Sequence, residues 1–312
     1  SIREFPAMNK HQIAPSIALD IYTRMTRIRV FEEQVAKLFA QGRLPGFVHL
    51  YIGEEAVAAG IDDILLVIGR TKRAIEEYFD RNVELEAALE AKGRAAEAER
   101  LRRISNMAHI HYVWQKQMNG LGDAILQARQ HVGNEPFAIL LGDTIFDAPR
   151  PVLQQLLDVY ARRGEPVVAL EEVPLQKVSR YGIVKGEPLT DREIRIEDLI
   201  EKPAPAEAPS RLAIASRYIL TPGIFDHLQR VKPGKNGEIQ LTDAMRMLLA
   251  DTPMYGLRVE GGREDIGNKL EFIKANLKHG LRDAEIGQAL ADYIVETARR
   301  LQAPPTPDAG RP

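Results

Sequence analysis

The segment Phe137-Ala-Ile-Leu-Leu141 is an uninterrupted apolar run that ends at Gly142-Asp143. A run of this kind predicts a strand buried on both faces, which is the pattern of a parallel sheet. Gly142 allows the backbone to turn or to approach a ligand, so the carboxylate of Asp143 is expected just past the carboxyl end of the strand. Ligands bind at that edge of open α/β sheets, and an Asp there suits Mg²⁺ and phosphate chemistry. A turn-capping role for Asp143 fits this segment equally well.

Strands and helices alternate around this run. Buried or alternating apolar patterns predict strands at 62–69, 109–115, 137–141 and 166–173. Helices are expected at 123–132 and 151–163, and a helical hairpin at 71–104 that breaks at Asn82 and Gly93. The alternation predicts an α/β fold with a doubly wound, Rossmann-like sheet.

The C-terminal half continues with shorter elements. Hairpin-like strands are expected after Tyr181, followed by a strand at 212–221 and a helix with Pro222 in its first turn. Thr242 or Asp243 lies in capping range of the next helix. A strand at 254–261 precedes an Asp-Ile-Gly turn and a helix, and the tail 301–312 is expected to be disordered because it is rich in proline.

Composition excludes several classes of protein. The chain of 312 residues has 42 Lys and Arg against 44 Asp and Glu, without a basic block, which argues against nucleic acid or an anionic membrane as the main partner. It has no cysteine, so neither a disulfide framework nor a thiolate metal site can form. No apolar run approaches the roughly 20 residues that span a bilayer. Without a signal-peptide core at its start, a soluble cytoplasmic protein is expected.

The pair His109 and His111 is a possible metal-binding pattern. The strand 109–115 alternates, so both imidazoles fall on the face opposite Ile110, Tyr112 and Trp114. An HxH pair can bind a metal ion. No third ligand follows at a suitable spacing, so a plain strand is the favoured interpretation.

A first resemblance covers roughly residues 18–60. The segment RMTRIRVFEEQVAKLFAQGRLPGFVHLYIGEEA, preceded by a predicted helix at 16–41, resembles the start of the alpha subunit of thiamine-diphosphate-dependent 2-oxo acid and acetoin dehydrogenases. That resemblance would place His49 near the cofactor. The family's Gly-Asp-Gly motif, which holds Mg²⁺ and the diphosphate, is absent from the chain. A core or surface role for His49 is therefore favoured.

A second resemblance covers residues 57–300. The stretches EEAVAAGIDDILLVIGR, QKxxxGLGDA, FAILLGDTIF, EEVPLQKVSRYGIV, LIEKPAPAEAPS, RYILTPGIFD, GEIQLTDA and EDIGNKLEFIKAN occur in the order and at the spacing typical of the UTP–glucose-1-phosphate uridylyltransferase family. The resemblance implies a nucleotidyltransferase-type mixed sheet. It also implies formation of UDP-glucose and pyrophosphate from UTP and glucose 1-phosphate with Mg²⁺, by in-line attack without a covalent intermediate.

This resemblance also implies roles for individual residues. Gln115 would hydrogen-bond the uracil edge and Gly120 would let the ring pack on the backbone. Gly182 would lie against the sugar, while Glu201 would accept hydrogen bonds from its hydroxyls. The remaining roles fall to Lys202, which would contact the sugar phosphate, and to the two metal ligands Asp143 and Asp265. Asp143 and Lys202 are the predicted catalytic residues, and a homo-oligomer is expected. Asn268 and Glu271 replace the usual Asp and Gly after the metal turn, with mild effects expected.

The front of the chain departs from that family. The Gly-rich loop GxGTRxxPxTKxxPKE, which cradles the UTP phosphates, is absent, and the dehydrogenase-like segment stands in its place. The shared EEAVAAG near 54–60 is the expected junction of a chimeric sequence: a helical segment 1–56, a truncated transferase domain 57–300 and the tail. UTP turnover is expected to be weak or absent. The lost strand would be central in the sheet, and the β-prone GFVHLYI (46–52) is a candidate to replace it. A dehydrogenase fragment and a non-catalytic sugar-phosphate-binding protein are the alternatives.

Overall fold

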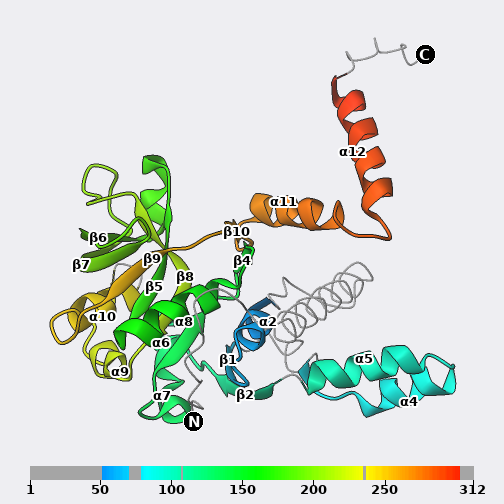
Figure 1. Cartoon of the computed structure of the whole chain (residues 1–312), viewed down its shortest axis with the longest axis horizontal. Coiled ribbons are helices and arrows are strands. Elements are labelled where there is room, and N and C mark those ends of the chain that lie inside the picture. The colour runs from blue at the N-terminus through cyan, green and yellow to red at the C-terminus, as the bar shows by residue number, and fades with distance from the viewer. Residues whose placement is uncertain (1–50, 70–78, 107, 235–236, 303–312) are drawn as a thin grey trace, which may run out of the picture. The chain divides into compact units, whose positions relative to one another are not determined.

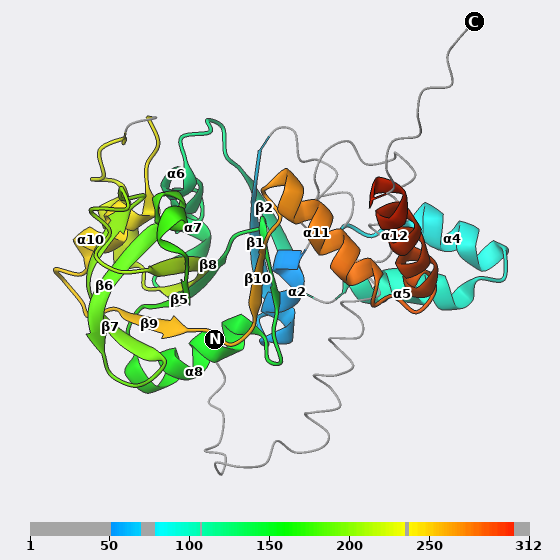
Figure 2. The same cartoon turned by 90° about the horizontal axis from the view of Figure 1, so that it is seen from above.

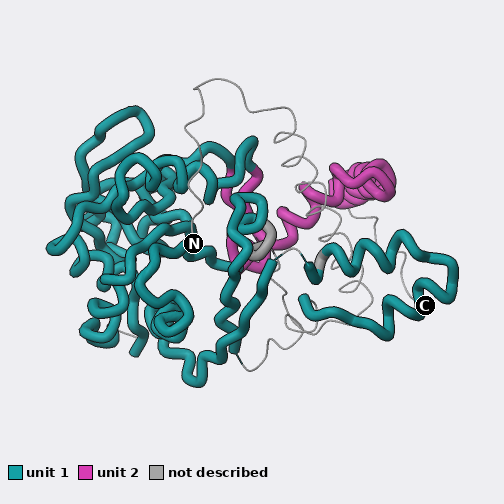
Figure 3. Tube along the Cα trace, turned by 60° about the horizontal axis from the view of Figure 1, so that its bottom comes forward, with its two compact units in different colours: residues 1–142, 148–261 teal, residues 143–147, 262–312 magenta. Residues whose placement is uncertain are grey.

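The computed structural model of the chain describes residues 51–69, 79–106, 108–234 and 237–302. These residues form two compact units, coloured separately in Figure 3. The first unit contains the described parts of 1–142 and 148–261, and the second contains 143–147 with the described part of 262–312. The predicted helix at 16–41, His49, the predicted tail from 303 onward and most of the dehydrogenase-like segment lie outside the described residues.

The main sheet of the first unit is mixed (Figures 1 and 2). Its outer pairing β7–β6 is antiparallel, β7 is antiparallel to β9, and β9 is parallel to β5. Strands β3 and β5 and one residue pair of β6 all run antiparallel to β8. Its spatial order is β3 (Phe137–Leu140), β8 (Leu212–Leu220), β5 (Val167–Glu172), β9 (Tyr255–Arg258), β7 (Glu193–Glu201) and β6 (Gly182–Pro188). The predicted α/β mixed sheet is thus present.

Strand β3 differs from its prediction. Its four residues are only half-buried, and it pairs antiparallel with β8 rather than parallel to a neighbour. Among the described strands β8 is its only partner, so β3 stands at one end of the sheet. The expectation of a parallel strand buried on both faces is therefore wrong. An apolar run reports that side chains are apolar, but it does not fix the direction or number of neighbouring strands.

A second, smaller sheet in the first unit consists of β1 (Asp63–Ile68) and β2 (His109–Trp114). The two strands are parallel, with Asp63 opposite His109. Alternate residues Ile64, Leu66 and Ile68 are buried, which confirms the strand predicted at 62–69. In the described part of the chain this pair is not hydrogen-bonded to the main sheet.

Helices cover both faces of the main sheet. Helix α8 (Val152–Arg163) packs on β5 and β8. Helices α9 (Gly223–Leu228) and α10 (Leu241–Leu248) share a buried cluster with Val168 and Leu170 of β5. Because side chains alternate along a strand, the buried Val167 and Ala169 point to the other face. Shorter elements are α6 (Leu121–Leu126), α7 (Arg129–Val132) and the 3₁₀ helix η1 (Leu175–Arg180).

Helix α2 (Tyr51–Ala58) is joined to the core by a buried ion pair. The Glu55 carboxylate lies 2.8 Å from the Arg217 guanidinium of β8, and it also accepts a hydrogen bond from the Leu153 backbone N–H. The prediction that 46–52 forms a strand is wrong at 51–52, which are helical, and 46–50 lie outside the described residues. Helix α2 also runs across the predicted boundary between residues 56 and 57.

The predicted helical hairpin is confirmed by α4 (Val83–Ala91) and α5 (Ala95–Ser105). The Asn82 side chain caps α4 by accepting a hydrogen bond from the Leu85 N–H. Arg102 of α5 reaches the nearly buried carboxylate of Glu86 at 2.9 Å and so joins the two helices.

The second unit contains β4 (Thr144–Asp147), β10 (Gly262–Asp265), α11 (Lys269–Gly280) and α12 (Gly287–Gln302). Strands β4 and β10 are antiparallel, with Asp265 opposite Thr144. The sequence patterns did not predict this pairing. Within the described ranges, no helix has both the length and the apolar character needed to cross a bilayer.

Candidate functional site

The predicted sugar contacts lie together where β6 begins and β7 ends. Gly182 and Glu201 are directly opposite in the β6–β7 register. The Glu201 carboxylate accepts a 2.6 Å hydrogen bond from the Thr242 hydroxyl. A Cβ atom on Gly182 would lie 2.8 Å from that hydroxyl and 3.2 Å from Glu201 Oε2. A side chain at this position would collide with these groups, so only glycine fits, and its backbone packs directly beside a fixed carboxylate.

Lys202 has a strained backbone. Its φ of 46° is in the left-handed region, which costs a residue with a Cβ about 1–2 kcal/mol. The conformation is held by its N–H, which donates to the Tyr181 carbonyl at 3.0 Å. Its ammonium is half-exposed and lies 3.3 Å from Glu201 Oε1. Backbone strain at an exposed cation is a reason to consider a functional role for Lys202.

Helix α10, beside this cluster, carries an acid with a shifted pKa. Burial, together with the charge of Glu201, raises the pKa of Asp243 above its ordinary value. The prediction that Thr242 or Asp243 caps the helix is wrong, because α10 starts after Gln240 without a side-chain cap. Instead, the Thr242 hydroxyl donates a hydrogen bond to the Glu201 carboxylate. This contact joins two of the quoted motifs, LIEKP and GEIQLTDA, across 41 positions.

The predicted uracil contacts lie at the turn between β2 and α6. The Gln115 amide donates to Asp123 Oδ2 at 2.8 Å and to the Gly120 carbonyl at 3.2 Å, which fixes its orientation. Gly120 has φ of 94°, and a Cβ there would lie 2.8 Å from the Glu238 Cβ. The first reason for glycine at this position is therefore close packing of the turn against the 238–239 segment.

Ile239 is a residue that sequence reasoning missed. Its carbonyl accepts from the Gly122 N–H at 2.8 Å, and its N–H donates to the Asn119 carbonyl at 2.7 Å. A Cβ on Gly122 would lie 2.7 Å from both the carbonyl and the side chain of Ile239. The two glycines of the GLG turn thus let it pack against the GEIQ segment. The sequence signal was the GxG spacing, but nothing in it named the partner.

The predicted metal ligands both lie in the second unit, at the paired ends of β4 and β10. The Ile266 N–H donates to the Asp143 carbonyl at 2.9 Å, which holds Asp265 beside Asp143. A Cβ on Gly267 would lie 3.3 Å from Asp143 Oδ2 and 3.3 Å from Asp265 Oδ1. The two oxygens are therefore separated by at most twice that distance. Two carboxylates facing one small space are a suitable pair of ligands for a hard divalent cation.

Asn268, which follows this turn, begins the next helix. Asn268 caps α11 by accepting hydrogen bonds from the Leu270 and Glu271 N–H groups, so it satisfies the helix end as Asp would. Burial alone would raise the pKa of Glu264, but hydrogen bonds from His279 and Lys278 outweigh it and lower that pKa. This ion-pair cluster attaches β10 to α11.

Comparison with known proteins places this geometry among nucleotidyl transferases. The family model described as nucleotidyl transferase matches residues 46–280. The chain is 45% identical over 246 residues to the UTP–glucose-1-phosphate uridylyltransferase of Staphylococcus haemolyticus, covering 79% of this chain and 85% of that protein. It is 44% identical over 244 residues to the enzyme of the same name from Staphylococcus epidermidis, with 78% and 85% covered.

Solved structures agree with the sequence comparison. UDP-glucose pyrophosphorylase complexed with UDP-glucose is similar with a TM-score of 0.68 and 40% identity, over 75% of this chain and 86% of that one. A UTP-bound UGPase from Acinetobacter baumannii is similar with a TM-score of 0.73 and 35% identity, over 80% and 87%. The predicted fold class is confirmed.

Proposed function

Because this chain belongs to the nucleotidyl transferase family, we propose that it acts on UTP and glucose 1-phosphate and forms UDP-glucose and pyrophosphate. The observation that carries the proposal is the 45% identity to a uridylyltransferase over most of both chains. The solved complex with UDP-glucose belongs to a similar protein and supports the same substrate class. These comparisons do not favour the thiamine-diphosphate alternative.

We assign the sugar phosphate to the cluster at β6, β7 and α10. Glu201, oriented by Thr242, would accept hydrogen bonds from glucose hydroxyls, and the bare backbone at Gly182 would lie against the ring. The half-exposed ammonium of Lys202 would contact the phosphate. A carboxylate for hydroxyls and an ammonium for phosphate divide the two chemistries of the substrate between neighbouring side chains.

We assign the uracil ring to the turn between β2 and α6. The Gln115 amide group, whose nitrogen is held by Asp123 and Gly120, would present its carbonyl oxygen to an N–H of the uracil edge. The positive φ of Gly120 favours glycine, which leaves that backbone without a side chain. Support for this assignment comes from the fixed orientation of the amide, which lowers the entropy cost of binding.

We propose that Asp143 and Asp265 hold Mg²⁺. The family generally uses a divalent metal ion, and Asp143 Oδ2 and Asp265 Oδ1 each lie 3.3 Å from the position of a Cβ on Gly267, so the two carboxylates lie near a common point. When bound, the ion would screen the charge of the phosphates. The two carboxylates would supply its protein ligands.

The missing Gly-rich loop sets the expected level of activity. Removal of one preorganised donor typically lowers kcat by about 10²–10³, and here a whole phosphate cradle is absent from the sequence. We therefore propose that UTP turnover is very slow. The chimeric origin and the domain limits 1–56, 57–300 and 301–312 stay predictions, although the family match at 46–280 overlaps the second of them.

Three titrations and one assay test the proposal. Calorimetric titration with glucose 1-phosphate, UDP-glucose and thiamine diphosphate should show binding of the first two only, and Glu201→Gln should weaken glucose 1-phosphate binding. Glu197→Gln, an exposed carboxylate on the same strand, is the control. Pyrophosphate release at a rate within tenfold of an intact uridylyltransferase would contradict the proposal that the missing Gly-rich loop makes turnover very slow. Binding of thiamine diphosphate alone would contradict the function itself.

We also propose a homo-oligomer. Leu270, Ile273, Leu277 and Leu281 are exposed and follow one face of α11 and its end, at the spacing of a helix that packs on a partner. Leu277→Lys should shift the chain toward monomer in light scattering after size exclusion, whereas Lys274→Ala should not. A monomeric parent chain would contradict this proposal. The cytoplasmic location stays a prediction.

A further inference from the structure

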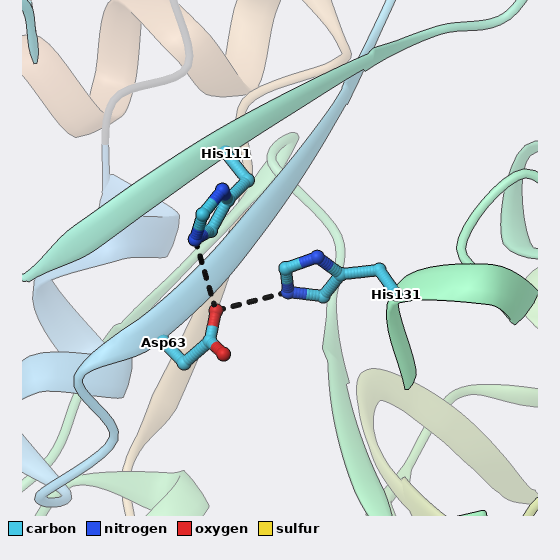
Figure 4. Close-up of side chains that lie close together, drawn as sticks. All are labelled: Asp63, His111 and His131. Atoms are coloured by element: carbon cyan, nitrogen blue, oxygen red, sulfur yellow. Dashed lines mark hydrogen bonds and ion pairs between the residues drawn. The ribbon is translucent and has the colours of Figure 1, made fainter. Parts of the chain in front are cut away.

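Three potential metal ligands converge in the first unit. Asp63 of β1, His111 of β2 and His131 of α7 present one ligand atom each, and these atoms all lie within 4.8 Å of one another. Figure 4 shows both imidazole rings directed at the same carboxylate. In the sequence, no third ligand follows His109 and His111 at a suitable spacing. The fold brings two other ligands to His111, namely Asp63 and His131.

The strand register explains the convergence. Strands β1 and β2 are parallel, with Asp63 opposite His109 and Leu65 opposite His111. His111 is thus the diagonal neighbour of Asp63 on the same face, a separation that long side chains can bridge. His131 comes from α7, and its Nε2 lies 2.9 Å from Asp63 Oδ1, while His111 Nε2 lies 3.7 Å from the same oxygen.

We propose that Asp63, His111 and His131 form a binding site for Zn²⁺ or a similar transition-metal ion. Ligand atoms of a tetrahedral Zn²⁺ site lie about 2.0–2.1 Å from the ion and therefore about 3.3 Å from one another. The distances of 2.9 and 3.7 Å bracket that value, so small side-chain rotations bring the set onto one ion. Three protein ligands leave a fourth position for water.

The donor set also separates this site from the carboxylate pair at Asp143 and Asp265. Imidazole nitrogen suits Zn²⁺, whereas Mg²⁺ prefers oxygen ligands. The three side chains are 65%, 53% and 30% exposed for Asp63, His111 and His131, so an ion can reach them from solvent. A bound ion would fasten α7, which directly precedes β3, to the two-stranded sheet.

The test is metal binding by the full chain after removal of metal with EDTA. With Mg²⁺ saturating, calorimetry with Zn²⁺ should show one ion per chain, and Co²⁺ should give the visible absorption of a tetrahedral site. Changes in outer-shell partners of metal ligands cost 10–100-fold in affinity, so His131→Ala and His111→Ala, which remove a ligand itself, should each weaken Zn²⁺ binding at least about 100-fold. His109→Ala is the matched control, since it removes an exposed imidazole on the same strand outside the cluster.

Two further measurements distinguish loss of the metal site from loss of folding. Zn²⁺ should raise the Tm of the parent and of His109→Ala but not of Asp63→Asn, which keeps the shape of the side chain. Zn²⁺ binding should weaken when the pH is made acidic, because imidazole binds metal only when deprotonated. Unchanged Zn²⁺ affinity in folded His131→Ala, or an equal loss in His109→Ala, would overturn the proposal.

Discussion

Replacing Arg217 with Met tests the ion pair that joins α2 to the core. The Arg217 and Glu55 side chains are 0% and 1% exposed, and their charged groups lie 2.8 Å apart. Arg217→Met leaves the Glu55 carboxylate in the core with the hydrogen bond from Leu153 N–H but no counter-charge. Breaking a buried pair from one side costs about 3–5 kcal/mol. For a chain of this size, about 2–4 °C per kcal/mol converts this loss into a fall in Tm of roughly 6–20 °C.

The double variant Glu55→Gln with Arg217→Met is the decisive comparison. Gln at position 55 can still accept the hydrogen bond from Leu153, and it no longer places a charge in the core. Replacing both members of a buried pair is often neutral or stabilising, so the double variant should recover most of the lost stability. Urea unfolding of the four proteins in the cycle measures the coupling energy directly.

Additive effects would refute this reasoning. If each single change costs less than about 1 kcal/mol and the double change costs their sum, the two side chains are not coupled. The outcome also bears on the junction, because Glu55 lies in the EEAVAAG segment that both resemblances share. Strong coupling would assign α2 to the transferase body and place any junction before it.

Three other changes have defined outcomes. Lys202→Asn should raise the free energy of unfolding by up to about 1 kcal/mol, because Asn tolerates a left-handed φ better. The same variant should weaken glucose 1-phosphate binding in calorimetry. A loss of stability would argue against strain at this position. Burial and the charge of Glu201 raise the pKa of Asp243, so its ionised form opposes folding. The stability of the parent chain should therefore fall as the pH rises from about 4 through that raised pKa. Urea unfolding of Asp243→Asn should not show this fall. Gly267→Ala should weaken Mn²⁺ binding about 10–100-fold in a spin-resonance titration, whereas Gly262→Ala, which meets nothing within 4 Å, should not; equal effects would remove Gly267 from the metal site.

Local patterns predicted the elements whose signals lie within a few residues. The strand expected at 62–69 is β1 (Asp63–Ile68), and the break expected at Asn82 is a helix cap in the structure. The sequence also predicted the two turns that carry the candidate metal ligands, one at Asp143 and one at Asp265. These features depend on apolar alternation and capping chemistry, which act between near neighbours.

Features that depend on distant partners could not be read from local patterns. Glu55 and Arg217 are 162 positions apart, and nothing near either one reveals the other. Strands β4 and β10 have four residues each, too short for a periodic signal. The neighbours of β3 are set by the topology of the whole sheet, so its direction and burial were predicted wrongly. His131 joined His111 only through the fold.

Gly182 and Glu201 are proposed to bind the sugar, and Thr242 orients Glu201. The elements that hold these residues explain why binding of glucose 1-phosphate and turnover of UTP should separate in this chain. Glu201 and Gly182 are held by the β6–β7 register, and Thr242 is held by α10, which packs on β7. All of these supports lie between residues 182 and 248. The phosphate cradle of the resembling family would instead precede α2, where this chain has a different sequence. The proposed absence of that cradle would leave the supports of Glu201 unchanged, because binding at a preorganised site depends on the groups that hold it. Retained glucose 1-phosphate affinity with slow pyrophosphate release is the combination that follows from this arrangement.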